Sequence, residues 1–158
     1  MMKLIGVTVV TMAWLFGAYT PSLACSCAYI GPLEMYETAD GVFTGTVQTI
    51  TVRKHLGFPY LDVAFRVTAV WKGISTSTVH VATSISDASC GVFFEPAKEY
   101  LVYALDNEVY PQGRWRTHLC TRTRSVEYAQ EDFDALGEPS PEPLGNSTWG
   151  KIKALYED

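Results

Sequence analysis

The chain has 158 residues, of which 47% are hydrophobic and 18% are charged, and its formal net charge is −5. This length suits one domain with a hydrophobic core of ordinary size. The acidic balance argues against nucleic acid, heparin-like polymers and anionic membranes as the main partners.

Residues 1–24 are predicted to be a secretory signal peptide. Lys3 supplies the positive start, residues 4–18 form an apolar run, and small residues lead to a cleavage site after Ala24. The apolar run is shorter than the ~20 residues that a membrane-spanning helix needs, so we expect no membrane span. Cleavage would make Cys25 the first residue of a secreted or periplasmic protein.

The rest of the chain is patterned mostly as β-strands, rich in β-branched and aromatic residues. The predicted strands cover residues 40–54, 60–73, 76–84, 99–106 and 114–120. Alternation is clearest in the second strand. We expect one face of that strand to consist of Leu61, Val63, Phe65, Val67, Ala69 and Trp71.

Two helices are predicted, a short one over residues 32–40 and a stronger one over residues 125–137. Ser125 is expected to cap the second helix, and Gly137 to end it. Its apolar stripe is predicted to be Val126, Ala129, Phe133 and Leu136. An ordinary solvated face is expected for the carboxylates Glu127, Glu131, Asp132 and Asp134.

These elements predict one domain over residues 25–137. The fold class that they favour is mostly β, a five-stranded OB-type barrel with a packing C-terminal helix and a disulfide-stapled N-terminus. Residues 138–158 are predicted to be a Pro-rich acidic linker and a short C-terminal tail.

The motif Cys25-Ser26-Cys27 follows the predicted cleavage site directly and has four interpretations. Two thiolates so close together can bind Cu(I) or exchange disulfides. Cys25 can instead be the lipid-attachment residue of a bacterial lipoprotein, although the preceding residues match such a site poorly. Both cysteines can simply staple the N-terminus, or the staples can hold the N-terminus for a purpose of its own.

Four cysteines in an exported chain predict two disulfides. Cysteines two positions apart on an extended strand point to opposite faces, so a bond between Cys25 and Cys27 would be strained. They are expected to bond to Cys90 and Cys120, and this reasoning leaves both orders open. We favour Cys25–Cys90 with Cys27–Cys120. Each bond would close a long loop, worth roughly 4 kcal/mol in the chain-entropy model.

The motifs around these cysteines resemble the inhibitory domain of the tissue inhibitors of metalloproteinases. The matching segments, in chain order, are Cys25-Ser26-Cys27, residues 40–45 (DGVFTG), 70–73 (VWKG), 89–91 (SCG), 99–104 (EYLVYA) and Cys120. The likeness extends over residues 25–137 and is specific as a set rather than motif by motif. The resemblance implies a netrin-like module with an OB-type barrel.

The resemblance also implies a partner, a zinc metalloprotease, and a way of inhibiting it. In that family the free α-amine and the carbonyl of the leading cysteine, here Cys25, chelate the zinc of the protease. The next side chain, here Ser26, enters the substrate pocket. The loop before the third cysteine is a further contact and corresponds to Ser86, Asp87, Ala88 and Ser89. The segment 55–60 is a looser candidate contact.

On this interpretation the chain is a monomer with no cofactor of its own. The alternative is a netrin-like protein-binding or envelope module without an inhibitory role, in one version lipid-anchored at Cys25.

No catalytic pattern emerges, so the chain is predicted not to be an enzyme. His55, His80 and His118 are scattered, without a metal-binding HExxH motif or a GxSxG nucleophile elbow. His80 and His118 are expected to face solvent or to be satisfied by local hydrogen bonds. The aromatic residues Tyr100, Tyr103, Trp71 and Trp115 are expected to belong to the core rather than to an exposed binding stripe.

Overall fold

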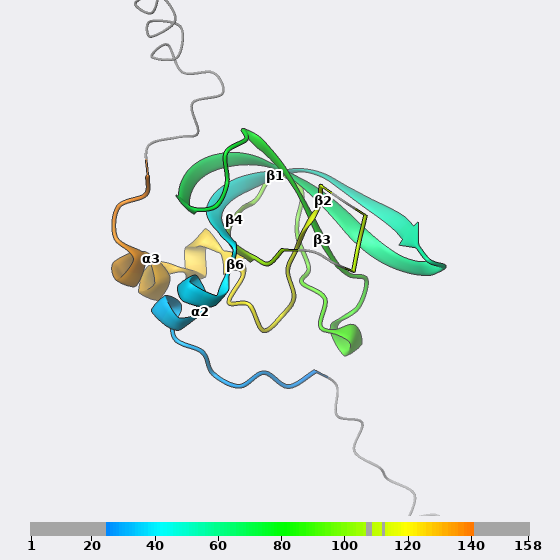
Figure 1. Ribbon diagram of the computed structural model, residues 1–158, viewed down its shortest axis with the longest axis horizontal. Helices are drawn as coiled ribbons and strands as arrows, with labels where there is room; N and C mark the ends of the chain where they lie inside the picture. Colours follow the sequence, from blue (N-terminus) through cyan, green and yellow to red (C-terminus); the bar gives the residue numbers. More distant parts are fainter. Residues whose placement is uncertain (1–24, 107–108, 112, 141–158) are drawn as a thin grey trace, which may run out of the picture.

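The computed structural model describes residues 25–106, 109–111 and 113–140 (Figure 1). The predicted leader and residues 141–158 lie outside the described residues. In chain order the elements are α2 (Pro32–Thr38), β1 (Gly41–His55), β2 (Phe58–Lys72), β3 (Thr78–Ser84), the 3-10 helix η1 (Asp87–Ser89), β4 (Glu99–Ala104), β5 (Trp115–Arg116), β6 (Arg124–Ser125), the 3-10 helix η2 (Val126–Tyr128) and α3 (Gln130–Leu136). Among the described residues, no helix is long and apolar enough to cross a membrane.

The six strands form one sheet in the order β5-β3-β2-β1-β4-β6. All neighbours are antiparallel except β3 and β5. The prediction of a mostly β fold is confirmed, with six strands where five were expected. The sheet is not closed into a barrel by a continuous ladder. An isolated bridge joins the residue after β4 to β5, where Leu105 and Arg116 exchange backbone hydrogen bonds of 2.8 and 2.9 Å.

The long hairpin of β1 and β2 contains register shifts that change which side chains face the core. Val63, Phe65 and Val67 lie in the core, as predicted. The pairing Thr44↔Ala69 is followed by Gly45↔Val67, so β2 carries one extra residue at this point. Such a bulge reverses the alternation beyond it. The predicted face is therefore wrong at its end, because Val70 rather than Ala69 joins the core.

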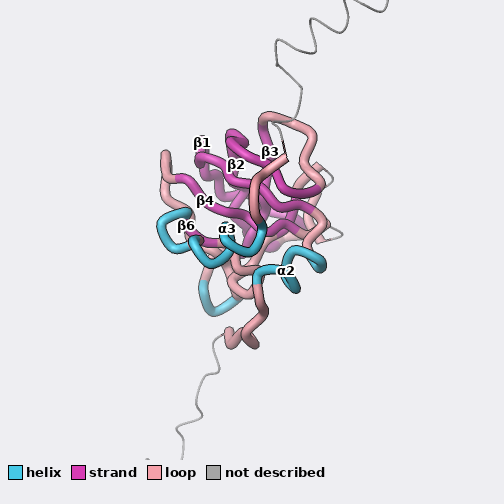
Figure 2. Tube along the Cα trace, turned by 90° about the vertical axis from the view of Figure 1, so that its left-hand side faces the viewer, coloured by secondary structure: helices cyan, strands magenta, loops and turns pink. Residues whose placement is uncertain are grey.

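Two hydrophobic clusters hold the fold together. The first contains most of the buried hydrophobic residues of the long hairpin, β3 and β4, together with Val92 and Phe94. The second lies between β1, β4 and the helices, and its buried members are Met35, Ala39, Val42, Leu101, Tyr103 and Ala129. Figure 2 shows α2 and α3 together beside the strands. The prediction that the aromatic residues belong to the core is confirmed for Tyr100 and Tyr103, which are buried.

Trp71 joins α3 to the sheet. Its ring stacks on Phe133 with the ring centroids 5.8 Å apart, and its Nε1–H donates to the carbonyl of Gly137 at 2.8 Å. Gly137 has a φ of 67° and ends the helix, as predicted. The prediction for Ser125 is wrong, because this residue belongs to β6 and its side chain caps neither η2 nor α3.

Candidate functional site

The leading segment of the described chain carries Cys25, Ser26 and Cys27, which were singled out from the sequence. Cys25 and Ser26 line a hollow of about 350 Å³ together with Ser89, Cys90 and Cys120. Asp87 and Ala88 lie beside it in η1, and neither they nor Ser86 line the hollow. The fold therefore brings together the motif after the predicted cleavage site and one end of the predicted contact loop.

Two disulfides fix this segment to the rest of the fold, in the favoured pairing. Cys25 is bonded to Cys90 with a Cα–Cα distance of 5.4 Å, and Cys27 is bonded to Cys120 at 5.2 Å. The sulfur atoms of Cys25, Cys27 and Cys120 all lie within 4.8 Å of one another, so the two bonds are neighbours. No cysteine is free. The copper or redox interpretation is not supported, because it requires free thiolates at Cys25 and Cys27.

The loop that carries Cys90 is closed by its own hydrogen bonds. Ser86 accepts at its carbonyl from the backbone N–H groups of Ser89 and Gly91, at 3.2 and 2.8 Å. The Ser89 hydroxyl also bonds those of Ser84 and Ser86. A Cβ on Gly91 would lie 2.2 Å from the carbonyl oxygen of Ser84, so only glycine allows this close approach. Cys25 is thus tethered to a well-supported loop.

The turn that carries Cys120 is joined to the same loop. The backbone N–H of Leu119 donates to the carbonyl of Cys90 at 2.8 Å. Within the turn, the N–H of Cys120 donates to Nδ1 of His118 at 3.2 Å, and Thr121 donates to the carbonyl of His118 through both its N–H and its hydroxyl. His118 is therefore satisfied by local hydrogen bonds, as predicted. Both disulfides end on one connected piece of backbone.

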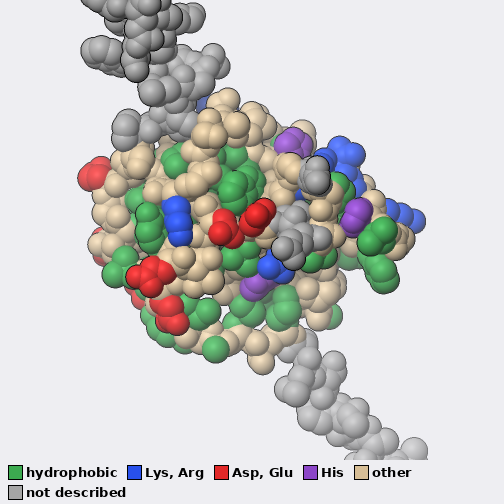
Figure 3. All heavy atoms as spheres, in the orientation of Figure 1, with side chains coloured by type: hydrophobic (Ala, Val, Ile, Leu, Met, Phe, Trp, Pro, Cys, Tyr) green, Lys and Arg blue, Asp and Glu red, His purple; other side chains and the backbone are tan. Residues whose placement is uncertain are grey.

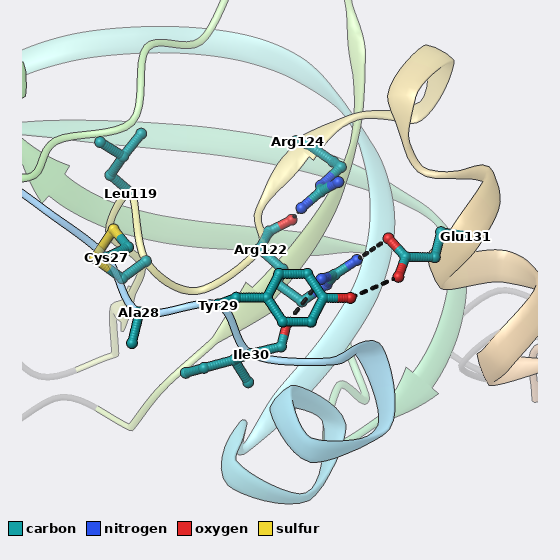
Figure 4. Close-up of a pocket in the computed structure, with 9 residues that line it drawn as sticks. Cys27, Ala28, Tyr29, Ile30, Leu119, Arg122, Arg124 and Glu131 are labelled. Atoms are coloured by element: carbon teal, nitrogen blue, oxygen red, sulfur yellow. Dashed lines mark hydrogen bonds and ion pairs between the residues drawn. A yellow bond between two sulfur atoms is a disulfide. The ribbon is translucent and has the colours of Figure 1, made fainter.

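Arg122 provides a third attachment for the leading segment (Figure 4). Its Nη1 donates to the carbonyl of Ile30 at 2.8 Å, and the ring of Tyr29 lies over the guanidinium at 5.7 Å. Tyr29 also donates its hydroxyl hydrogen to Glu131 at 2.9 Å. Arg122 and then Tyr29 lower the pKa of Glu131 by hydrogen bonding. These residues line a second hollow of about 330 Å³, which Cys27 borders on its other side.

The charge of Arg122 is balanced by a buried acid. Asp132 is 0% exposed and accepts from Nε and Nη2 of Arg122 at 2.8 and 3.1 Å. It also accepts the hydroxyl hydrogen of Tyr103 at 2.8 Å. The hydrogen bond to Asp132 raises the pKa of Arg122, and burial followed by the same carboxylate raises the pKa of Tyr103. The solvated face predicted for the carboxylates of this helix is therefore wrong at Asp132.

A second buried acid, Asp62, lies in β2. Asp62 is 2% exposed and accepts hydrogen bonds from Arg53, His80 and Arg114 at 2.6, 3.0 and 2.9 Å. Burial alone would raise the pKa of Asp62, but the bonds from Arg114 and His80 outweigh it and the pKa is lowered. The prediction that His80 is exposed or satisfied is confirmed. The sequence analysis did not single out Asp62.

The looser candidate segment 55–60 lies apart from the hollow beside Cys25. It forms the turn of the hairpin, which projects from the sheet, and it contributes to neither hollow (Figure 1). Leu56 and Phe58 there are 83% and 77% exposed. Figure 3 shows basic, histidine and hydrophobic side chains gathered at this end of the molecule. The hairpin end is thus a separate exposed surface.

Comparison with known proteins adds no assignment. No protein-family model matches the chain, and no curated protein sequence matches it.

Proposed function

We propose that the chain, after cleavage behind Ala24, is an exported monomer that inhibits a zinc metalloprotease. The α-amine and the carbonyl of Cys25 would chelate the zinc of the partner, and Ser26 would enter its substrate pocket. Catalytic zinc keeps one coordination position open, and an amine nitrogen with a carbonyl oxygen can fill it in place of water. On this proposal the protein is an inhibitor and not an enzyme.

The observation that carries the proposal is the way the leading segment is held. Ser26 is exposed between two disulfide-bonded cysteines, and both disulfides end on the joined loops at Cys90 and Cys120. A segment fixed before it meets its partner loses little conformational entropy on docking. Exposed hydrophobic residues lie close in sequence to the attachment points, namely Tyr29, Ile85 and Leu119, and they would offer apolar contacts to a protein partner.

The barrel expected from the resemblance remains part of this proposal. The bridge between Leu105 and Arg116 supports it, because it joins the end of β4 to β5 and so links the two sides of the sheet. With that link the neighbours run β1-β2-β3-β5-β4 and return to β1. This order is consistent with a partly open barrel of the OB type.

The test compares two proteins that differ by one residue at the start. One begins at Cys25, and the other carries one additional alanine before it. An amine must be unprotonated to bind zinc, and the extension moves the α-amine away from the chelating position. We expect the first protein to inhibit a secreted zinc protease and the second not to, with equal melting temperatures. Equal inhibition by both, or binding of neither to any protease in a panel of secreted zinc enzymes, would contradict the mechanism.

A second candidate is a netrin-like protein-binding module that does not inhibit. The exposed Leu56 and Phe58 at the hairpin end favour it, since they form a surface remote from the leading segment. A lipid-anchored version has less support, because the Cys25 sulfur that a lipid would alkylate is bonded to Cys90. Retained partner binding by the extended protein, together with its loss in Phe58→Ser, would favour this candidate.

A further inference from the structure

Arg116 is a charged residue that lines the hollow beside Cys25. It lies in β5, and its backbone is fixed by two hydrogen bonds to Leu105. Its side chain makes no hydrogen bond or ion pair with any residue that the structure describes, and its Nε is buried without an acceptor. A buried donor without an acceptor is costly, so such an atom calls for an explanation.

The other arginines with partly or fully buried heads show what Arg116 lacks. The Nε of Arg114 is likewise buried without a hydrogen-bond partner, but its Nη2 ends on the carboxylate of Asp62 at 2.9 Å. Arg122 and Arg124 approach the carboxylate of Asp132 at 2.8 and 3.8 Å. Arg116 is also half-buried, yet no aspartate or glutamate is among the described residues that line its hollow.

The other described residues that line the hollow include no lysine, aspartate or glutamate. They include the side chains of Ser26, Ser89 and Thr117, which bear hydroxyl groups. His118 also lines the hollow, and burial, followed by the charge of Arg116, lowers its pKa. The Nδ1 of His118 accepts from the backbone N–H of Cys120, and among the described residues that line the hollow Arg116 supplies the one fixed positive charge.

We propose that the hollow beside Cys25 is a carboxylate-binding site, with the guanidinium of Arg116 as its cation. A guanidinium presents two parallel N–H groups that match the two oxygens of a carboxylate. One fixed positive charge suits a singly charged carboxylate better than a phosphate dianion. The volume of about 350 Å³ has room for a small acid or for one acidic side chain or chain end of a peptide. This proposal does not depend on zinc chelation, since Arg116 is not a chelating group.

The test is an acetate titration of the oxidised, ¹⁵N-labelled protein, followed by NMR of the arginine Nε–H signals. The Arg116 signal is the one missing from the spectrum of Arg116→Gln. We expect it to shift saturably with acetate and not with sodium chloride at equal ionic strength. In the matched control Arg66→Gln, which removes an exposed arginine outside the hollow, the titration should be unchanged.

A linear response, or the same shift with sodium chloride, would overturn the proposal. If Arg116→Gln does not fold, Arg116→Lys identifies the signal instead, and it should weaken acetate binding about tenfold or more because lysine lacks the paired N–H groups. Acetate binding that persists unchanged in a folded variant would also overturn it.

Short peptides then identify the source of the carboxylate. Competition with acetate by a peptide with a free C-terminus, but not by its amide, would assign the site to chain ends. Competition by an amidated peptide containing glutamate would assign it to acidic side chains, and acetate binding without peptide competition would assign it to free small acids. No protease is present in these titrations, so their failure is distinguishable from a failure of the inhibitor proposal.

Discussion

Replacing Asp132 by alanine tests whether the buried ion pair holds α3 and the leading segment in place. The substitution removes the acceptor of three hydrogen bonds, two from Arg122 and one from Tyr103. The side chain of Arg122 is 6% exposed, so its charge cannot turn readily into water. Breaking a buried ion pair by removing one partner costs about 3–5 kcal/mol. Glu131 still accepts from Nη2 of Arg122 at 2.8 Å, so we expect about 3 kcal/mol, the lower end of that range.

The assay is urea unfolding of the oxidised protein, with the free energy extrapolated to water. For a slope of about 2 kcal/mol per molar urea, the midpoint should fall by roughly 1.5 M. Asp134→Ala is the control, because Asp134 is exposed on the same helix and should change stability by less than about 0.5 kcal/mol. A loss below about 1 kcal/mol for Asp132→Ala would refute the reasoning, since it would mean that Arg122 finds another acceptor at little cost.

Three further predictions concern the core and the dependence of stability on pH. Phe65→Ala should cost about 3–5 kcal/mol in urea unfolding because Phe65 is 0% exposed, whereas Phe58→Ala at the exposed hairpin end should cost little. The pKa of His118 is lowered in the fold, so its contribution to stability is present above the unfolded pKa of about 6.5 and is lost as the pH falls through the folded pKa. His118→Gln should remove that part of the pH dependence of the melting temperature, and an unaltered profile would contradict this. The pKa of Asp62 is also lowered, so Asp62→Asn should destabilise the fold at pH 7, by an amount that shrinks as the pH falls below about 3.9. An equal loss of stability at pH 7 and at pH 2.5 would count against the ion pair with Arg114.

The course of β2 shows how far alternation alone predicts a strand. Val63, Phe65 and Val67 were assigned correctly, because a regular strand sends every second side chain to the same face. Beyond them the bulge changes the phase, so Trp71 packs against α3 rather than in the first cluster. Alternation carries no signal for this bulge, because it arises from pairing with β1. The core could therefore be predicted only up to the point where pairing changed the register.

Asp132 illustrates a signal that was present in the sequence. It follows Ala129 by three positions and precedes Leu136 by four, so helical spacing places it on the apolar stripe. A carboxylate there calls for a buried cationic partner. The identity of that partner could not be foreseen, because Arg122 precedes the helix and Tyr103 comes from β4. The same holds for Asp62, whose arginine partners come from β1 and from the segment before β5.

The leading segment, residues 25–31, has no regular secondary structure of its own, so its position depends on what it is tied to. Its three attachments are the disulfide of Cys25, the disulfide of Cys27 and the hydrogen bond from Arg122 to Ile30. Together they restrain both ends and the middle of the segment. The conformational entropy of these residues is therefore lost during folding rather than during binding. A segment restrained in this way gains nothing for the core, since residues 26–29 remain exposed, and it is the kind of arrangement that preorganised docking requires.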